Sequence, residues 1–142
     1  MSLTVRTVEY YYTRAKDNLD NAYQLLEKLA SEEVNLLAFG AVPYGSGMIE
    51  LQVFPDRAAG LLKVARELGW DLTGPQHAIL VQGDDSLGAL ADIHRHLREA
   101  NVDIYASTGV TDGQGRYGYV IYVKEDDFPT ATKALMRTMV SA

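Results

Sequence analysis

The sequence predicts an α+β fold in which two βαββαβ units follow one another along the 142 residues. Two observations carry this prediction. The chain repeats itself after 68 residues, and both copies alternate strand-like and helix-like segments in the same order. We expect the first unit over residues 1–73 and the second over 77–142. Residues 74–76, in "TGPQ", form the expected joint because they combine Gly and Pro.

The internal repeat is visible without any gap over 23 residues. The segment "DNLDNAYQLLEKLASEEVNLLAF" at 17–39 aligns with "DSLGALADIHRHLREANVDIYAS" at 85–107. In this alignment Leu29 meets Leu97, and both are apolar positions of a helix-like stretch. Because self-similarity at a fixed period marks repeated structural units, both segments should fold in the same way.

The first copy begins with a strand rich in β-branched and aromatic residues. A helix follows, since apolar residues recur at helical spacing, and Gly69 is suited to end the second helix. Asp56 is expected to cap that second helix at its N-terminus. In order, the elements are a strand at 7–13, a helix around 22–29, strands at 34–42 and 48–54, a helix at 57–68 and a short strand at 70–72.

The second copy has the same order of elements. Its second helix is expected to begin at Asp126 or Asp127 as the N-cap. The last strand is barely present, because only "TMVSA" remains for it. The elements are a strand at 77–82, a helix around 90–100, strands at 102–110 and 118–123, a helix at 127–138 and the remnant at 138–142.

A βαββαβ unit places two helices on one face of an antiparallel four-stranded sheet, which is the ferredoxin-like arrangement. One such unit leaves a sheet edge open, so two units side by side can share an extended sheet. Outer edges or helix faces still remain to be covered. For this reason we expect a homodimer.

Composition excludes several classes of partner. The net charge of −6 disfavours nucleic acid and anionic membrane surfaces, and no apolar run approaches the roughly 20 residues that span a bilayer. Cys is absent, which excludes disulfides and Cys-based zinc sites and fits a reducing compartment. The N-terminal "MSLTVRTVEYYY" has no h-region, so we expect a cytoplasmic protein without a signal peptide.

Two motifs invite a chemical interpretation that their context opposes. Gly113, Gly115 and Gly118 spell G-x-G-x-x-G, but the run leads into a strand, so a turn between strands is favoured over a nucleotide site. His94 and His96 lie two apart on a predicted helix and point about 200° apart, which disfavours a metal pair. No Ser/His/Asp or Cys/His arrangement is visible. We therefore expect neither an enzyme nor a cofactor or metal.

The turn "GDDSLGAL" at 83–90 leads from a predicted strand into a predicted helix. Asp85 or Ser86 can accept hydrogen bonds from the first free amides of that helix, and capping alone would explain the turn. Gly88 lacks a Cβ, so a ligand can approach, and the helix N-terminus attracts a carboxylate. Asp103, or Asn35 in the first copy, begins the next strand and suits an ammonium group. An amino acid has both groups.

These turns resemble the signature of the ACT domain family, D-x-P-G-x-L followed by a helix and a hydrophobic-N-I step. The second copy has "DSLGAL" with Leu87 in place of the proline, then "NVDI". The first copy has "DNLDNA" with Asp20 in place of the glycine, then "EVNL". The resemblance covers nearly the whole chain as two tandem copies.

The resemblance implies regulatory binding of amino acids at interfaces between ACT modules. Because Asp20 adds a negative charge, the resemblance implies weaker or altered binding in the first copy. It thereby favours a ligand that touches Asn35 of one copy and the turn at 85–88 of the other. The implied ligand residues are Asp85, Ser86, Leu87, Gly88 and Asp103 in the second copy, and Asp17, Asn18, Leu19, Asp20 and Asn35 in the first.

ACT modules commonly accompany a metabolic enzyme. The sequence therefore favours a sensor that acts on an enzyme or regulator in trans. One alternative is an interaction module whose turns only cap helices, and another is a small enzyme of unknown type.

Overall fold

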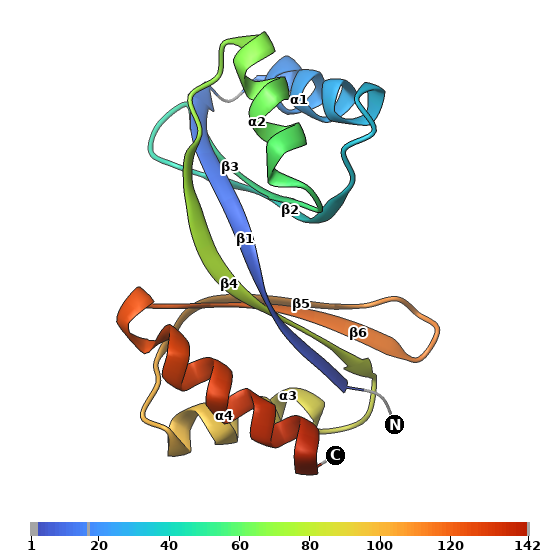
Figure 1. The fold of residues 1–142 in the computed structure, drawn as a ribbon, viewed down its shortest axis with the longest axis vertical. Coiled ribbons are helices and arrows are strands. Elements are labelled where there is room, and N and C mark those ends of the chain that lie inside the picture. Colours follow the sequence, from blue (N-terminus) through green and yellow to red (C-terminus); the bar gives the residue numbers. More distant parts are fainter. Residues whose placement is uncertain (1–2, 17, 142) are drawn as a thin grey trace. The chain divides into compact units, whose positions relative to one another are not determined.

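The computed structural model describes residues 3–16 and 18–141 (Figure 1). Apart from the last strand expected for each copy, strands and helices follow one another in the predicted order, and the α+β class is confirmed. The elements are β1 Leu3–Lys16, α1 Leu19–Ser31, β2 Leu36–Pro43, β3 Met48–Pro55, α2 Ala58–Leu68, β4 Thr73–Asp84, α3 Ala89–Glu99, β5 Ile104–Thr111, β6 Arg116–Val123, the 3-10 turn η1 Glu125–Asp127 and α4 Phe128–Ser141.

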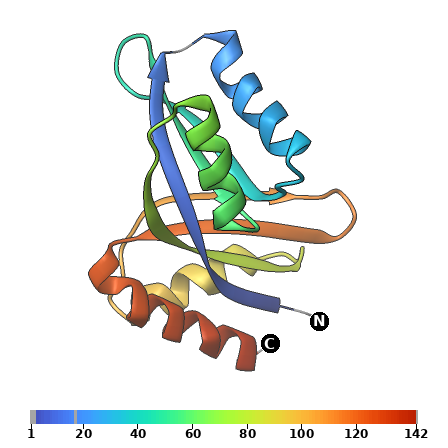
Figure 2. The same ribbon diagram turned by 45° about the horizontal axis from the view of Figure 1, so that its top comes forward.

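The chain divides into two compact units. The first unit consists of residues 9–76, and the second unit combines residues 1–8 with 77–142. The sequence-based ranges place residues 1–8 in the first unit, whereas this grouping places them in the second. The reason is the length of β1, which contributes its beginning to one unit and its end to the other (Figure 2).

Each unit has the ferredoxin-like arrangement. The strand order is β2-β3-β1-β4 in the first unit and β1-β4-β6-β5 in the second. Adding 68 to the pairing of Tyr11 with Val53 gives the observed pairing of Ile79 with Ile121. Even the irregularity between Leu36 and Ala38 in β2 recurs at the matching place in β5. The repeat therefore extends to the register of the strands.

The fourth strand of each unit comes from an exchange of strand ends. In the second unit the beginning of β1 lies beside β4, and Thr4 Oγ1 donates to the carbonyl of Gln82 at 3.5 Å. In the first unit the beginning of β4 lies beside β1. There, a Cβ on Gly74 would be 2.7 Å from the Tyr11 ring and 3.0 Å from the Tyr10 carbonyl oxygen.

This exchange explains where the expected last strands went. Residues 70–72 precede β4 and are not a strand, while residues 74–76, the expected joint, lie within β4. Residues 138–141 of "TMVSA" continue α4, since no Gly or Pro interrupts the helix-forming run before them. Ala142 lies outside the described residues.

The apolar stripes predicted from helical spacing form the two cores. In the first unit Leu25 and Leu29 are buried, and in the second Ile93 and Leu97 are buried at the equivalent positions. Burying each such side chain contributes about 1.5–3 kcal/mol relative to exposure. Each core lies between one sheet face and its two helices, which hold the strand–helix turns in place.

One predicted helix cap is wrong and one helix end is confirmed. Gly69 ends α2 in the left-handed conformation with φ of 72°, as expected. Asp56 does not cap α2, because its amide bonds the carbonyl of Asn35 and the helix begins after Arg57. Asp126 and Asp127 lie in the 3-10 turn directly before Phe128, the first residue of α4, so a cap of that helix by either of them stays a prediction.

Candidate functional site

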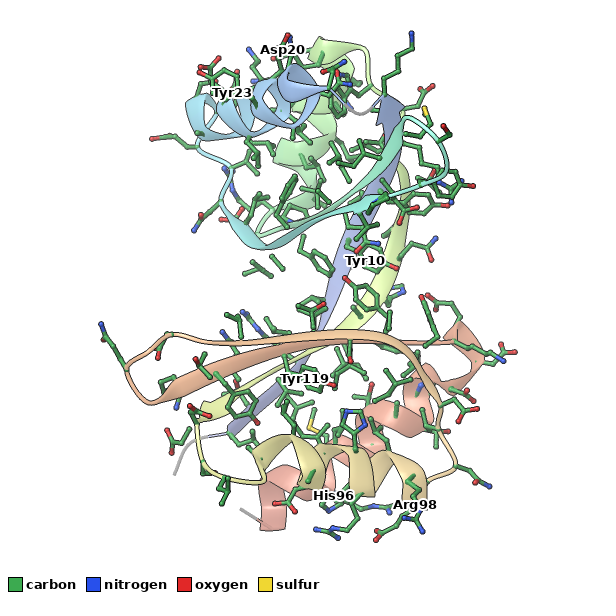
Figure 3. The ribbon with its side chains drawn as sticks, turned by 180° about the vertical axis from the view of Figure 1, so that it is seen from behind. Tyr10, Asp20, Tyr23, His96, Arg98 and Tyr119 are labelled. Carbon is green, nitrogen blue, oxygen red and sulfur yellow. The ribbon has the colours of Figure 1, made fainter. Side chains whose placement is uncertain are left out.

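The entry of α1 is closed by its own side chains. Asn18 is the N-cap, and its Oδ1 accepts from the amides of Asp20 at 3.0 Å and Asn21 at 3.1 Å. Leu19 is the first residue of the helix, and Asp20 is exposed beside it (Figure 3). Asp17 lies outside the described residues. A ligand carboxylate would therefore meet a satisfied helix end and an additional negative charge.

Asn18→Ala is expected to lower the free energy of unfolding by about 1 kcal/mol, because two helix amides lose their acceptor. Urea denaturation measures the loss. Gln24→Ala, at an exposed position inside the same helix, is the matched control and should leave stability unchanged or slightly higher. A loss for Asn18→Ala no larger than for the control would contradict the cap.

The entry of α3 is open. Gly88 is the N-cap in the left-handed conformation with φ of 85°, and no side chain caps the helix. Asp85, Ser86, Leu87 and Gly88 are all exposed. A Cβ on Gly88 would meet nothing within 4 Å.

The expected capping by Asp85 or Ser86 is therefore wrong. The backbone of the turn explains why: the amide of Asp85 donates to the carbonyl of Gly115 at 2.8 Å, and the Ser86 carbonyl accepts from the Ala89 amide at 3.1 Å. These two bonds fix the turn without using either side chain. The carboxylate and hydroxyl are thus left at the surface beside an uncapped helix end.

The α3 entry and Asp103 do not form one small site within the second unit. Helix α3 has 11 residues, so its ends are about 16 Å apart, and Asp103 follows the far end. The same holds in the first unit, where 13 residues of α1 separate Asn18 from the loop that leads to Asn35. One amino acid cannot touch both places in one unit.

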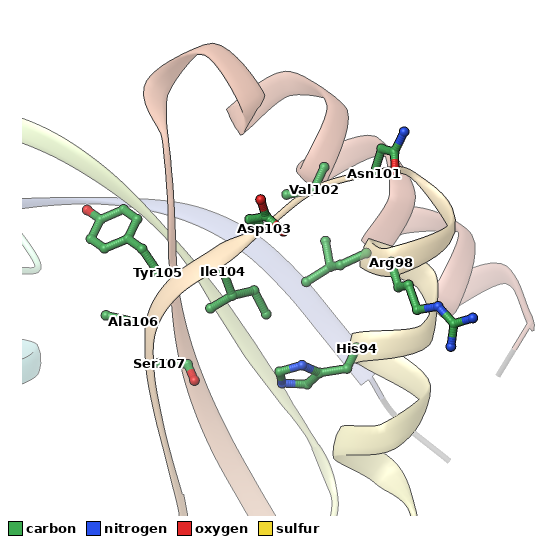
Figure 4. Close-up of a pocket in the computed structure, with 10 residues that line it drawn as sticks. His94, Arg98, Asn101, Val102, Asp103, Ile104, Tyr105, Ala106 and Ser107 are labelled. Carbon is green, nitrogen blue, oxygen red and sulfur yellow. The ribbon is translucent and has the colours of Figure 1, made fainter.

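A cavity of about 530 Å³ lies at the far end of α3, between this helix and β5 (Figure 4). Asp103 is the one predicted ligand residue that lines it. The lining residues are His94, Leu97, Arg98, Asn101, Val102, Asp103, Ile104, Tyr105, Ala106 and Ser107.

A chain of hydrogen bonds crosses from α3 to β5 beside this cavity. His94 Nε2 lies 2.7 Å from Tyr119 Oη, which donates to Ser107 Oγ at 2.8 Å. Tyr119 is only 5% exposed, so its hydroxyl is buried and fully engaged. Sequence spacing did not indicate this chain, because the three residues lie on three different elements.

The G-x-G-x-x-G run joins β5 to β6, as predicted: Gly113 and Gly115 lie in the turn and Gly118 in β6. The amides of Gln114 and Arg116 donate to the Asp112 carboxylate at 2.7 and 3.1 Å and hold its pKa below the ordinary value. Arg116 also pairs with Asp84 at 2.9 Å, next to the α3 entry. The run stabilises a hairpin and leaves no helix end for a phosphate.

The described residues offer neither a metal-binding cluster nor a membrane-spanning helix. Over residues 3–16 and 18–141, no group of three or more His, Cys, Asp or Glu side chains could hold a metal ion. His94 and His96 turn to different partners, the latter to the carbonyl of Asp92 at 2.7 Å. In the same residues no helix is long and apolar enough to cross a membrane.

No protein-family model and no curated protein matches the sequence. Among solved structures, the chain is similar to protein BT0572 from Bacteroides thetaiotaomicron. The TM-score is 0.80 at 15% identity, covering 94% of this chain and 90% of that chain. It is also similar to the ligand-free regulatory subunit of aspartate kinase from Thermus thermophilus. Here the TM-score is 0.68 at 11% identity, with 95% of each chain covered.

The chain has a tandem ACT-like fold. A putative C-terminal regulatory domain of aspartate kinase from Porphyromonas gingivalis is a further match, with a TM-score of 0.55 at 16% identity and 97% of each chain covered. The Thermus thermophilus and Porphyromonas gingivalis structures are thus described as regulatory parts of that enzyme. In this ACT-like protein, the two strand–helix turns named by the family resemblance do lie at the entries of α1 and α3.

Proposed function

We propose that this ACT-like protein is a non-enzymatic regulatory sensor that binds an amino acid, or a similar small zwitterion, at an interface between ACT-like units. The observation that supports it is the open entry of α3. Gly88 leaves that helix end uncapped and exposed, whereas Asn18 and Asp20 close and charge the entry of α1. We therefore assign the stronger site to residues 85–88.

The physical basis is the positive end of the helix. The first amides of an α-helix lack partners within the helix, and the aligned peptide dipoles attract an anion there. The Ser86 hydroxyl, exposed in the turn, can donate to the same carboxylate. The ligand's ammonium group would then be held by an acceptor from another ACT-like unit, such as Asn35 or Asp103.

Similarity to regulatory subunits supports a role in regulation. The Thermus thermophilus protein is a separate regulatory subunit, and this chain covers 95% of it. By analogy, we propose a homodimer in the cytoplasm that acts on a metabolic enzyme or regulator in trans. The net charge of −6 argues against nucleic acid and anionic membranes as partners.

A thermal-shift screen against the twenty amino acids at millimolar concentration tests the sensor. A ligand at about 100 times its Kd adds about 2.7 kcal/mol of stability, which raises the melting temperature measurably. The carboxamide of each hit serves as the matched control, since it keeps the ammonium and side chain but loses the carboxylate. A screen without a hit would count against the sensor.

The exposed edge strand β5 favours a second candidate function, an interaction module without a small ligand. All residues of β5 after Ile104 are exposed, with Tyr105 at 63% and Val110 at 71%. An exposed apolar edge strand is a template for pairing with another chain. This candidate predicts self-association that no amino acid alters, and analytical ultracentrifugation with and without ligand separates it from the sensor.

A further inference from the structure

We propose that the cavity between α3 and β5 of the second unit is a separate binding site for a small zwitterion with a hydrogen-bonding side chain, such as a polar amino acid. It lies at the end of α3 opposite to residues 85–88 and is not the site proposed above. The argument rests on a comparison of this unit with its own repeat, which has the same strand register.

The apolar part of the cavity lining is the same in both units. The shift of 68 residues matches an apolar side chain of the cavity with an apolar side chain in the first unit at four places. The matched pairs are Leu97 with Leu29, Val102 with Val34, Ile104 with Leu36, and Ala106 with Ala38. These positions serve the core, so they say nothing of a ligand.

Part of the polar lining has no polar counterpart in the first unit, whereas Asn101 and Asp103 match the polar Glu33 and Asn35. The lining residues His94, Arg98 and Ser107, and Tyr119 behind them, have apolar counterparts: His94 matches Leu26, Arg98 matches Ala30, Ser107 matches Phe39 and Tyr119 matches Leu51. Leu51 is completely buried and Phe39 packs against the first core. The fold therefore accepts apolar residues at these positions, so packing alone does not explain the polar residues of the second unit.

The polar residues also change the space. Where Phe39 packs against the core in the first unit, Ser107 leaves room between helix and strand. Gly109 faces Tyr119 across the two strands, and a Cβ on it would lie 2.9 Å from the ring. Small residues on β5 thus make room for the large Tyr119 on β6, and the cavity lies where Ser107 is smaller than its counterpart Phe39.

The hydrogen bonds determine which atoms are left for a ligand. Because Tyr119 donates to Ser107, it accepts from His94 Nε2, so a neutral His94 has an acceptor at Nδ1. The Ser107 hydroxyl proton remains to be donated. Figure 4 shows the His94 side chain reaching from α3 toward β5. One donor and one acceptor therefore flank the cavity on a chain that the buried Tyr119 holds in place.

Charges of both signs complete the site. Asp103 and Arg98 line the cavity, and neither forms an ion pair in the described part of the chain. Asp103 suits an ammonium group. Arg98 extends outward from α3, away from β5 (Figure 4), and another rotamer of its flexible side chain would bring positive charge to the cavity for a carboxylate. A volume of about 530 Å³ accommodates an amino acid.

The test replaces the polar chain with its counterparts from the first unit. The triple variant His94→Leu/Ser107→Phe/Tyr119→Leu should fold, because the repeat carries the same residues. Amide shifts in a 15N correlation spectrum of the full chain are followed while each polar amino acid is added. We expect the amides of residues 94 and 103–107 to shift in the wild type and these shifts to be lost in the triple variant.

Three outcomes decide between the sites. Shifts of the amides of residues 94 and 103–107 that persist in Gly88→Asp but are lost in the triple variant support the cavity site. Shifts confined to residues 85–90 overturn the cavity site and leave the proposed function intact. The same holds if the shifts of residues 94 and 103–107 persist in the triple variant. No shift with any polar amino acid overturns the cavity site, and no shift with any of the twenty amino acids overturns the proposed function as well. If the triple variant does not fold, the single variant Ser107→Phe, which fills the cavity, must abolish the shifts of residues 94 and 103–107.

Discussion

Gly74→Ala is expected to lower the free energy of unfolding by about 3 kcal/mol, as measured by urea denaturation. Gly74 has φ of 147°, a conformation that costs other residues about 1–3 kcal/mol. The added Cβ would also lie 2.7 Å from the Tyr11 ring and 3.0 Å from the Tyr10 carbonyl oxygen. Forcing a methyl group into such a contact costs about a further 1–3 kcal/mol.

The matched control for this change is Gly113→Ala. Gly113 also has a positive φ, 75°, but a Cβ there meets nothing within 4 Å, so only the conformational cost of about 1–2 kcal/mol remains. The difference between the two variants isolates the packing of β4 against β1 in the first unit. Equal losses would mean that residues 74–76 are a joint rather than part of the sheet.

Gly88→Asp is expected to weaken ligand binding at the α3 entry about thirtyfold, or about 2 kcal/mol. The new carboxylate would lie beside the ligand's own carboxylate, and like charges a few ångströms apart repel at the protein surface. Gly88→Asn is the matched control. It has nearly the same shape, tolerates the left-handed conformation, and adds no charge.

The Kd for this comparison is fitted to the amide shifts of residues 86 and 90 during titration with the amino acid. Neither side chain meets an obstacle within 4 Å of its Cβ, so both variants should keep the fold. Equal Kd values for the Asp and Asn variants would place the ligand carboxylate elsewhere.

The helices and strands could be predicted because their signals are local. Leu25, Leu29, Ile93 and Leu97 recur at helical spacing, and all four are buried where the spacing placed them. The gap-free repeat extended this to the second copy, down to the register of the strand pairs. Gly69 was predictable as a helix end because the left-handed conformation favours glycine.

The strand exchange could not be predicted in the same way. Alternating apolar residues indicate a strand but not its neighbour, and β1 is long enough to serve both units. The sequence pattern therefore predicted a last strand within each copy. Instead, residues 73–76 serve as the fourth strand of the first unit and residues 3–8 as that of the second. The caps failed for a related reason: backbone bonds from distant residues, such as Asp85 to Gly115, decide them.

The cavity between α3 and β5 was not predicted, although the sequence contains a signal for it. His94, Ser107 and Tyr119 have no diagnostic spacing, so no motif joins them. Aligning the copies nevertheless puts each of them against an apolar residue of the first unit. In a repeat protein, polar residues that replace buried apolar ones in a single copy indicate a site that the fold itself does not need.

Calorimetric titration of the full chain with glycine and with both enantiomers of the other nineteen amino acids tests the central claim most directly. A site that holds the carboxylate, the ammonium group and the side chain must distinguish the two hands. We predict saturable binding of the L form of at least one amino acid, with the D form at least about tenfold weaker, or about 1.4 kcal/mol. Absence of saturable heat for all twenty, or equal affinity for both enantiomers, would contradict the account.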